Sequence, residues 1–283
     1  MAPRFGAHAF LWIDEWTVEK GNFAIAAAGA VGFDFIEIPL LKPGEFTPDA
    51  HKPALEAAGI SAAASLVLPD DAHMPRAPEK AKAFLVNALD KTAAVGGDYL
   101  CGCLAFALGV FTGSAPTRAE RQTVIGCMME IAAEAGSRGI TLGFEVVNRY
   151  EGYMYNTLAD ACETIRAVGS DHLKLHADTY HMNIEEQGFY QPLVDYADLL
   201  GYMHMSESHR GLVGSGTVNW EEVFHGLADG DYKGPLVLES FASINPDLQA
   251  ATKLWRPPNQ SSDVLARDGL RFLRQYSERY QLQ

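Results

Sequence analysis

The sequence predicts an α/β protein, a single (β/α)8 barrel that occupies residues 1–283 as one domain. Apolar, strand-like runs alternate with helical segments through eight units, and the strands are continuously apolar, as in a parallel sheet covered on both faces. The chain also lacks a Gly-x-Gly-x-x-Gly turn, which favours a closed barrel over a doubly wound sheet. A length of 283 residues is ordinary for one barrel of this class.

Each predicted strand is a short apolar run bounded by polar or turn residues. Runs of this length and composition suit parallel strands that are buried on both faces. In chain order the predicted strands are residues 5–12, 33–40, 60–68, 98–104, 140–147, 173–177, 199–205 and 235–239.

A segment with helical spacing of its apolar residues follows each strand. The segment 78–95 is amphipathic and rich in alanine and leucine, and Thr117 is a suitable N-cap for the long helix after it. In chain order the predicted helices are residues 16–30, 48–58, 78–95, 118–138, 157–168, 190–196, 220–227 and 263–280.

Two segments, 69–77 and 243–262, have no regular pattern. Both follow strands, so both are expected at the C-terminal face of the barrel, where the active sites of barrel enzymes form. Each is either part of such a site or a plain surface loop.

The composition argues against several classes of partner and location. A net charge of −14 is unfavourable for nucleic acid or anionic membranes, which attract clustered Lys and Arg. No apolar run approaches about 18 residues, so no membrane span is expected, and the N-terminus lacks a signal-peptide pattern. Cys101 and Cys103 are expected to be buried free thiols rather than a zinc or redox pair. A reduced, cytoplasmic protein is therefore expected.

Four of the later strands end in an acid or a histidine. Glu145, Asp178, His204 and Glu239 stand at the ends of the fifth to eighth strands, and in a barrel these ends surround one mouth. Three carboxylates crowded together need a cation to offset their repulsion. Their mostly oxygen ligand set suits Mn²⁺, Co²⁺ or Mg²⁺, with zinc as a remaining alternative. The sequence therefore predicts one divalent metal site at this mouth.

Three further titratable residues lie within or near strand ends. His176 precedes Asp178 by two residues and is either a partner of the metal ligands or a hydrogen-bonded core histidine. Glu37 and Glu207 either support the metal ligands or are solvated, and surface roles are favoured.

The residues around these strand ends resemble the D-tagatose 3-epimerase family. This family includes the D-allulose (psicose) and L-ribulose 3-epimerases and belongs to the xylose-isomerase-like TIM barrel superfamily. The resemblance covers essentially the whole chain. Its most specific stretches are Glu145-Val-Val-Asn-Arg-Tyr-Glu151, Asp178-Thr-Tyr-His-Met-Asn-Ile-Glu-Glu186, His204 with Arg210 after it, and Leu238-Glu239-Ser.

The resemblance implies a metal-dependent isomerase that inverts C3 of free ketoses such as D-tagatose, D-fructose, D-allulose and L-ribulose. It places the metal ligands, with Mn²⁺ expected, on Glu145, Asp178, His204 and Glu239, and the acid/base pair on Glu145 and Glu239. One glutamate would remove the C3 proton and the other would return one to the opposite face, through a cis-enediolate that the metal stabilises. It further implies a homodimer or homotetramer. The residues implied to contact the sugar are Glu151, His181 and Arg210.

Departures from the family affect the choice of sugar. His8 stands where an aromatic residue is expected, Ser65 stands where a cysteine occurs, and the stretch from Leu104 lacks an expected tryptophan. These three positions are expected to line the pocket beyond C3. An aldose–ketose isomerase resembling hydroxypyruvate isomerase, or an inosose dehydratase, remains an alternative on the same barrel. A zinc endonuclease is disfavoured by the negative charge, and a sugar-binding protein would leave the paired glutamates without a purpose.

Overall fold

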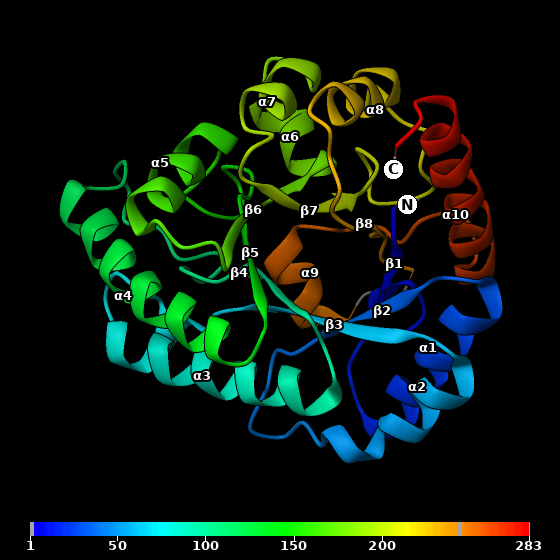
Figure 1. Cartoon of the computed structure of the whole chain (residues 1–283), viewed down its shortest axis with the longest axis horizontal. Helices are drawn as coiled ribbons and strands as arrows, with labels where there is room; N and C mark the ends of the chain where they lie inside the picture. The colour runs from blue at the N-terminus through cyan, green and yellow to red at the C-terminus, as the bar shows by residue number, and fades with distance from the viewer. Residues whose placement is uncertain (1–2, 243–244, 283) are drawn as a thin grey trace.

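The predicted barrel is confirmed: in the computed structural model, which describes residues 3–242 and 245–282, eight parallel strands close on one another in chain order (Figure 1). The first strand pairs with both the second and the last, which completes the ring. The strands are β1 (Phe5–His8), β2 (Phe35–Pro39), β3 (Ser61–Val67), β4 (Tyr99–Cys103), β5 (Thr141–Glu145), β6 (Leu173–Asp178), β7 (Leu200–Met205) and β8 (Leu236–Leu238).

Helices surround the barrel, and Figure 1 shows α9 lying inside the ring that the outer helices form. No helix in the described part of the chain is long and apolar enough to cross a membrane. The helices are α1 (Val18–Val31), α2 (Lys52–Ala58), α3 (Pro78–Val95), α4 (Arg118–Ser137), α5 (Leu158–Val168), α6 (Thr179–Glu185), α7 (Tyr190–Asp195), α8 (Trp220–Asp229), α9 (Pro246–Thr252) and α10 (Ser262–Arg279), with 3-10 turns η1 (Ala9–Leu11), η2 (Pro48–Ala50) and η3 (Asp70–Ala72).

Side-chain caps explain where several helices begin. Thr117 accepts a hydrogen bond from the backbone N–H of Glu120, whose carboxylate accepts one from the N–H of Thr117 in return. This reciprocal pair satisfies two backbone donors at the start of α4. The predicted N-cap is therefore confirmed.

Three local predictions were wrong or incomplete. The first strand ends at His8 instead of residue 12, because His8 caps η1 by accepting the N–H of Phe10 at 3.2 Å. α6 was not predicted, and it begins where Asp178 accepts the N–H of Tyr180 at 2.8 Å. The irregular segment 243–262 contains α9, and residues 243–244 of that segment lie outside the described residues.

The core has two parts. Most buried apolar side chains lie between the barrel and its helices. A smaller cluster packs separately, among strands of the barrel, and consists of Phe35, Ala63, Cys101, Tyr202 and Val237. Small residues make room for it: a Cβ on Gly6 would lie 2.3 Å from the ring of Phe35. All four cysteines are buried free thiols.

Candidate metal centre and active site

A cavity of about 630 Å³ opens at the C-terminal ends of the strands. Aromatic side chains, among them Phe10, Trp16, Phe46 and Phe241, form part of its lining. Such a mixture of apolar walls and a few converging polar groups is typical of a small-molecule site. The polar and charged side chains that the sequence singled out and that line the cavity are His8, Ser65, Glu145, Glu151, His181, His204, Arg210 and Glu239.

Parallel pairing of the strands places the four predicted metal ligands around this opening. Asp178 and His204 are register partners on β6 and β7, Glu145 ends β5, and Glu239 follows β8 directly. The ligand atoms of Asp178, His204 and Glu239 lie within 4.8 Å of one another. A carboxylate oxygen of Glu145 also lies within 4.8 Å of a ligand atom of Asp178 and of one of His204. The structure thus brings all four side chains together, each almost fully buried.

The imidazole of His204 gives an independent indication of a cation. Its Nδ1 has no hydrogen-bond partner in the part of the chain that the structure describes. This nitrogen lies 3.5 Å from Oε2 of Glu239 and 3.8 Å from Oε1 of Glu145. A buried, unpaired nitrogen that faces two carboxylates is what a metal ligand requires. The donor set of three carboxylates and one imidazole therefore fits a hard divalent ion such as Mn²⁺, Mg²⁺ or Co²⁺.

Arg210 supplies a fixed positive charge beside this cluster. Its guanidinium donates to Oδ2 of Asp178 at 2.7 Å and to Glu239, and it stacks 3.9 Å from the ring centroid of Tyr180. The backbone of Arg210 has a φ of 58°, a left-handed conformation that is uncommon for a residue with a side chain. Strained backbone of this kind often occurs at functional sites, where the surrounding structure maintains it.

The site pushes the pKa values of its carboxyl groups apart. Burial, with Glu239 and Asp178 nearby, raises the pKa of Glu145 well above its usual value, and burial raises that of Asp178 to about 6. Against the effect of burial, Arg210 and His204 hold the pKa of Glu239 well below its usual value. In the metal-free protein the two glutamates therefore differ in their tendency to ionise.

The predicted sugar contacts form a hydrogen-bonded group on the same side of the cavity. Asn148 donates from its side chain to Glu151 at 2.8 Å and from its backbone N–H to Nδ1 of His181 at 3.0 Å. Nδ1 of His181 accepts this bond, and Nε2 of the same ring lies 3.2 Å from the guanidinium of Arg210 and 3.6 Å from Asp178. Burial raises the pKa of Glu151 to about 7.

The three residues expected at the distal wall differ in their placement. His8 and Ser65 line the cavity, with Nε2 of His8 3.4 Å from Oγ of Ser65. Leu104 was a wrong prediction: among the described residues it is 1% exposed and packs into the main core, and Leu108 lines the cavity instead. The N–H of Leu104 donates to the carbonyl of Gly102 at 2.9 Å, which forms a tight turn at the end of β4.

Glu37 and Glu207 are corrections, since both are fully buried and have no surface role. Glu37 accepts hydrogen bonds from Tyr202 and His204. Glu207 accepts from the indole of Trp220 and from three backbone N–H groups. For Glu37, a role beside the metal ligands was the less favoured of the two alternatives, although its position two residues after the buried Phe35 places both side chains on the same face of β2.

His176 is also not the hydrogen-bonded core histidine that one interpretation expected. Both of its ring nitrogens lack a hydrogen-bond partner among the described residues, and Nδ1 lies 3.9 Å from Oε2 of Glu145. His176 therefore lies against the metal cluster without a hydrogen bond of its own.

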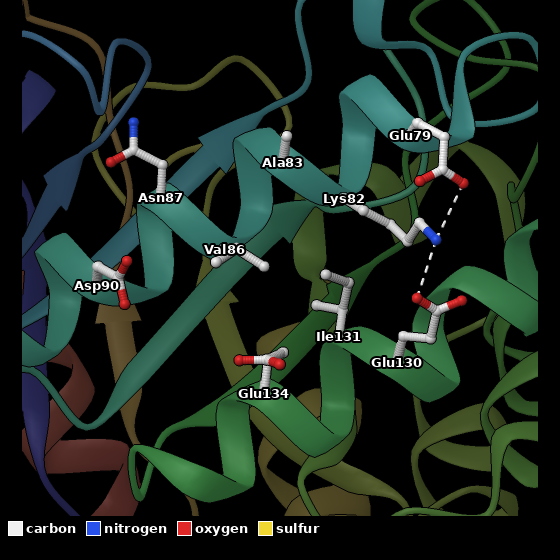
Figure 2. A pocket seen from close by; sticks show the side chains of 9 residues that line it. All are labelled: Glu79, Lys82, Ala83, Val86, Asn87, Asp90, Glu130, Ile131 and Glu134. Atoms are coloured by element: carbon white, nitrogen blue, oxygen red, sulfur yellow. Dashed lines mark hydrogen bonds and ion pairs between the residues drawn. The ribbon is translucent and has the colours of Figure 1, made fainter.

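A second hollow lies between α3 and α4 (Figure 2). Lys82 lies between two of its carboxylates, 3.0 Å from Glu79 and 2.9 Å from Glu130. Asp90 and Glu134 are likewise paired with Arg138. Since two cations pair its acidic groups, this groove presents an ordinary ion-paired surface between helices.

Comparisons with known proteins show the family to which the chain belongs. The family model described as "Xylose isomerase-like TIM barrel" matches residues 25–276. The chain is 37% identical to an L-ribulose 3-epimerase of Methylomonas sp. (strain DH-1), over 96% of each of the two chains. It is 34% identical to a ketose 3-epimerase of Arthrobacter globiformis, over 89% of each chain. A crystal structure of D-allulose 3-epimerase from Methylomonas sp. in complex with D-allulose superposes with a TM-score of 0.92 at 36% identity, over 97% of each chain.

Proposed function

Because this chain belongs to the xylose isomerase-like TIM barrel family, we propose that it is a metal-dependent ketose 3-epimerase. Its relatives are named epimerases, and the chain is accordingly an isomerase. The proposed substrates are free ketohexoses and ketopentoses of the D-allulose, D-fructose, D-tagatose and L-ribulose class. The observation that carries the proposal is the buried cluster of Glu145, Asp178, His204 and Glu239 around an unpaired imidazole nitrogen at the base of the cavity.

Glu145 and Glu239 are proposed as the acid/base pair. Inversion at C3 requires removal of the C3 proton and delivery of a proton to the opposite face. The two glutamates come from β5 and β8, which are not neighbours in the barrel. One carboxylate removes the proton, the other carboxyl group returns one, and the roles exchange with the other epimer. Both carboxyl groups line the same cavity, which supports this assignment.

The remaining residues of the cavity position the sugar. Glu145, Asp178, His204 and Glu239 would hold one divalent ion, Mn²⁺ in our proposal, which would polarise the ketose carbonyl and stabilise the charge that develops on proton removal. Nε2 of His181 lies 3.6 Å from Asp178, and the guanidinium of Arg210 donates to the same carboxylate, so both side chains face one side of the metal site. The cavity therefore favours a substrate with adjacent oxygen atoms, such as the carbonyl and hydroxyl at C2 and C3.

The proposal also covers the cavity wall beyond C3 of the sugar, the location of the protein and its oligomeric state. His8 and Ser65 form a polar pair at the cavity wall, suited to a sugar hydroxyl beyond C3. The buried free cysteines are in keeping with a reducing, cytoplasmic location. A homodimer or homotetramer is proposed from the family resemblance.

A substrate panel on metal-stripped protein tests the proposal. Protein treated with chelator is incubated with D-allulose, D-fructose, D-tagatose, L-ribulose or an inosose, with and without added Mn²⁺, and the products are separated by chromatography. We expect C3 epimers only in the samples that contain metal. Aldose products would indicate an aldose–ketose isomerase, turnover only of an inosose would indicate a dehydratase, and no turnover would contradict an enzyme of this class.

A further inference from the structure

Glu37 is far in the sequence from the predicted metal ligands, yet its side chain contacts one of them, His204. It belongs to β2, is 0% exposed, and is not among the described residues that line the cavity. Its Oε2 accepts the hydroxyl of Tyr202 at 2.6 Å. Nε2 of His204 lies 3.1 Å from Oε1 and 2.9 Å from Oε2 of the same carboxylate. Burial of a carboxylate costs several kcal/mol unless donors meet it, so this contact requires an explanation.

The two nitrogens of His204 have different surroundings. Nε2 faces Glu37, whereas Nδ1 is unpaired among the described residues and faces Glu145 and Glu239. A neutral imidazole carries its proton on one nitrogen and a lone pair on the other. A hydrogen bond from Nε2–H to a carboxylate therefore leaves the lone pair on Nδ1, where a cation would bind.

We propose that Glu37 is a positioning residue of the metal centre: its carboxylate holds the ring proton of His204 on Nε2 and so presents Nδ1 to a divalent cation. The inference rests on the proposed function, in which His204 is a metal ligand. Glu37 would contact neither the metal nor the sugar. Its effect passes through the ring of His204.

The surroundings of Glu37 favour this role over a second metal site. Ligand atoms of Glu37, Cys101 and His204 also lie within 4.8 Å of one another. However, the thiol of Cys101 donates to the carbonyl of Ala64 at 3.4 Å, and Tyr202 already donates to Glu37. Cys101 therefore donates elsewhere, and the carboxylate of Glu37 is met by the hydroxyl of Tyr202 and by Nε2 of His204, with Nε2 of His8 3.6 Å away.

The test measures Mn²⁺ binding to the full-length protein by titration calorimetry. Glu37→Gln keeps the size of the side chain but replaces the carboxylate, and we expect its Kd for Mn²⁺ to rise about 10- to 100-fold. Glu207→Gln is the matched control, because it makes the same chemical change at an equally buried glutamate that contacts no metal ligand. Tyr202→Phe is the second control, since it removes a donor to Glu37 but leaves the contact with His204. Both controls should keep the wild-type Kd.

A spectroscopic measurement separates positioning from a merely structural role. In Zn²⁺-loaded, ¹⁵N-histidine-labelled wild-type protein, we expect the proton of His204 on Nε2, with a downfield shift from its bond to a carboxylate. Glu37→Gln should move that proton signal upfield, and the controls should not. Should Glu37→Gln not fold, Glu37→Asp keeps the charge but shortens the side chain, and the same loss of affinity is expected.

The outcomes distinguish this inference from the proposed function. Wild-type Kd and unchanged His204 signals in Glu37→Gln would overturn the role of Glu37, even if the enzyme epimerises ketoses. A proton on Nδ1 in the loaded wild type would do the same. A wild type that binds Mn²⁺ and depends on Glu37 for it, but turns over no ketose, would support the inference and contradict the proposed reaction. No Mn²⁺ binding by the wild type would overturn both.

Discussion

At the scale of single residues, the proposed reaction depends on proton transfer by two glutamates, Glu145 and Glu239. Glu145→Gln and Glu239→Gln each keep an oxygen ligand and the side-chain size but remove the group that exchanges a proton. We expect each change to lower kcat by roughly 10²- to 10⁴-fold at saturating Mn²⁺. Activity and bound metal are measured on the same sample, so that loss of the metal is not mistaken for loss of the acid or base. Near-normal kcat in either variant would contradict its role in proton transfer.

Glu151 gives a prediction about pH. Burial raises its pKa to about 7 from a usual 4.5, so in the metal-free protein the folded state keeps a proton that the unfolded chain has released. The free energy of unfolding should therefore fall as pH rises through this window, by up to about 3 kcal/mol from this group. Glu151→Gln removes that loss.

Urea unfolding of the metal-free wild type and Glu151→Gln between pH 5 and about 7.5 measures the effect. The stability of the wild type relative to the variant should decline as pH rises. The exposed Glu163→Gln serves as a control for the substitution itself. Parallel pH profiles for wild type and Glu151→Gln would show that Glu151 is already ionised.

At the scale of elements, Glu207 holds the segment between β7 and α8 in place. Its carboxylate accepts the N–H groups of Ser208, Gly214 and Val218 and the indole N–H of Trp220, at 2.8 to 3.1 Å. Glu207→Ala leaves these donors without an acceptor. We expect a loss of about 3 to 5 kcal/mol in the free energy of unfolding.

Urea denaturation measures this loss, with Glu221→Ala as the comparison. Glu221 makes its ion pair with Arg279 at the protein surface, so its removal should matter much less. Equal losses for the two variants would mean that the loop is held by other contacts.

The strand ends explain how much of the site the sequence could predict. Glu145, Asp178 and His204 were recognisable because each interrupts an apolar run, and parallel strands bring their C-terminal ends together whatever the details of packing. The contact between Glu37 and His204 could not be predicted, because it joins β2 to β7 across the closed barrel and depends on the reach of both side chains. The placement of Leu104 goes with a tight turn at the end of β4, closed by the bond from its N–H to the carbonyl of Gly102, which the apolar pattern does not encode.

At the scale of the whole molecule, metal binding and folding stability are coupled. The four ligands come from four consecutive strands, β5 to β8, so a cation bound among them joins half of the barrel. Mn²⁺ at 1,000 times its Kd should add about 4 kcal/mol to the free energy of unfolding. For a chain of this size the Tm should rise by about 10 °C.

Scanning calorimetry of metal-free protein with and without Mn²⁺ measures the shift. His204→Ala removes one ligand and should reduce the shift strongly. An equal rise in Tm for the wild type and His204→Ala would place the bound Mn²⁺ somewhere other than this cluster.

The measurement that tests the central claim most directly is deuterium incorporation during turnover. Mn²⁺-loaded protein is incubated with D-allulose in D₂O, and the sugars are analysed by NMR. The two-glutamate account predicts a C3-epimeric product that carries deuterium at C3 and hydrogen at all other carbon positions. Deuterium at C1, or an epimer that retains its original hydrogen at C3 from the first turnover, would contradict proton exchange through Glu145 and Glu239.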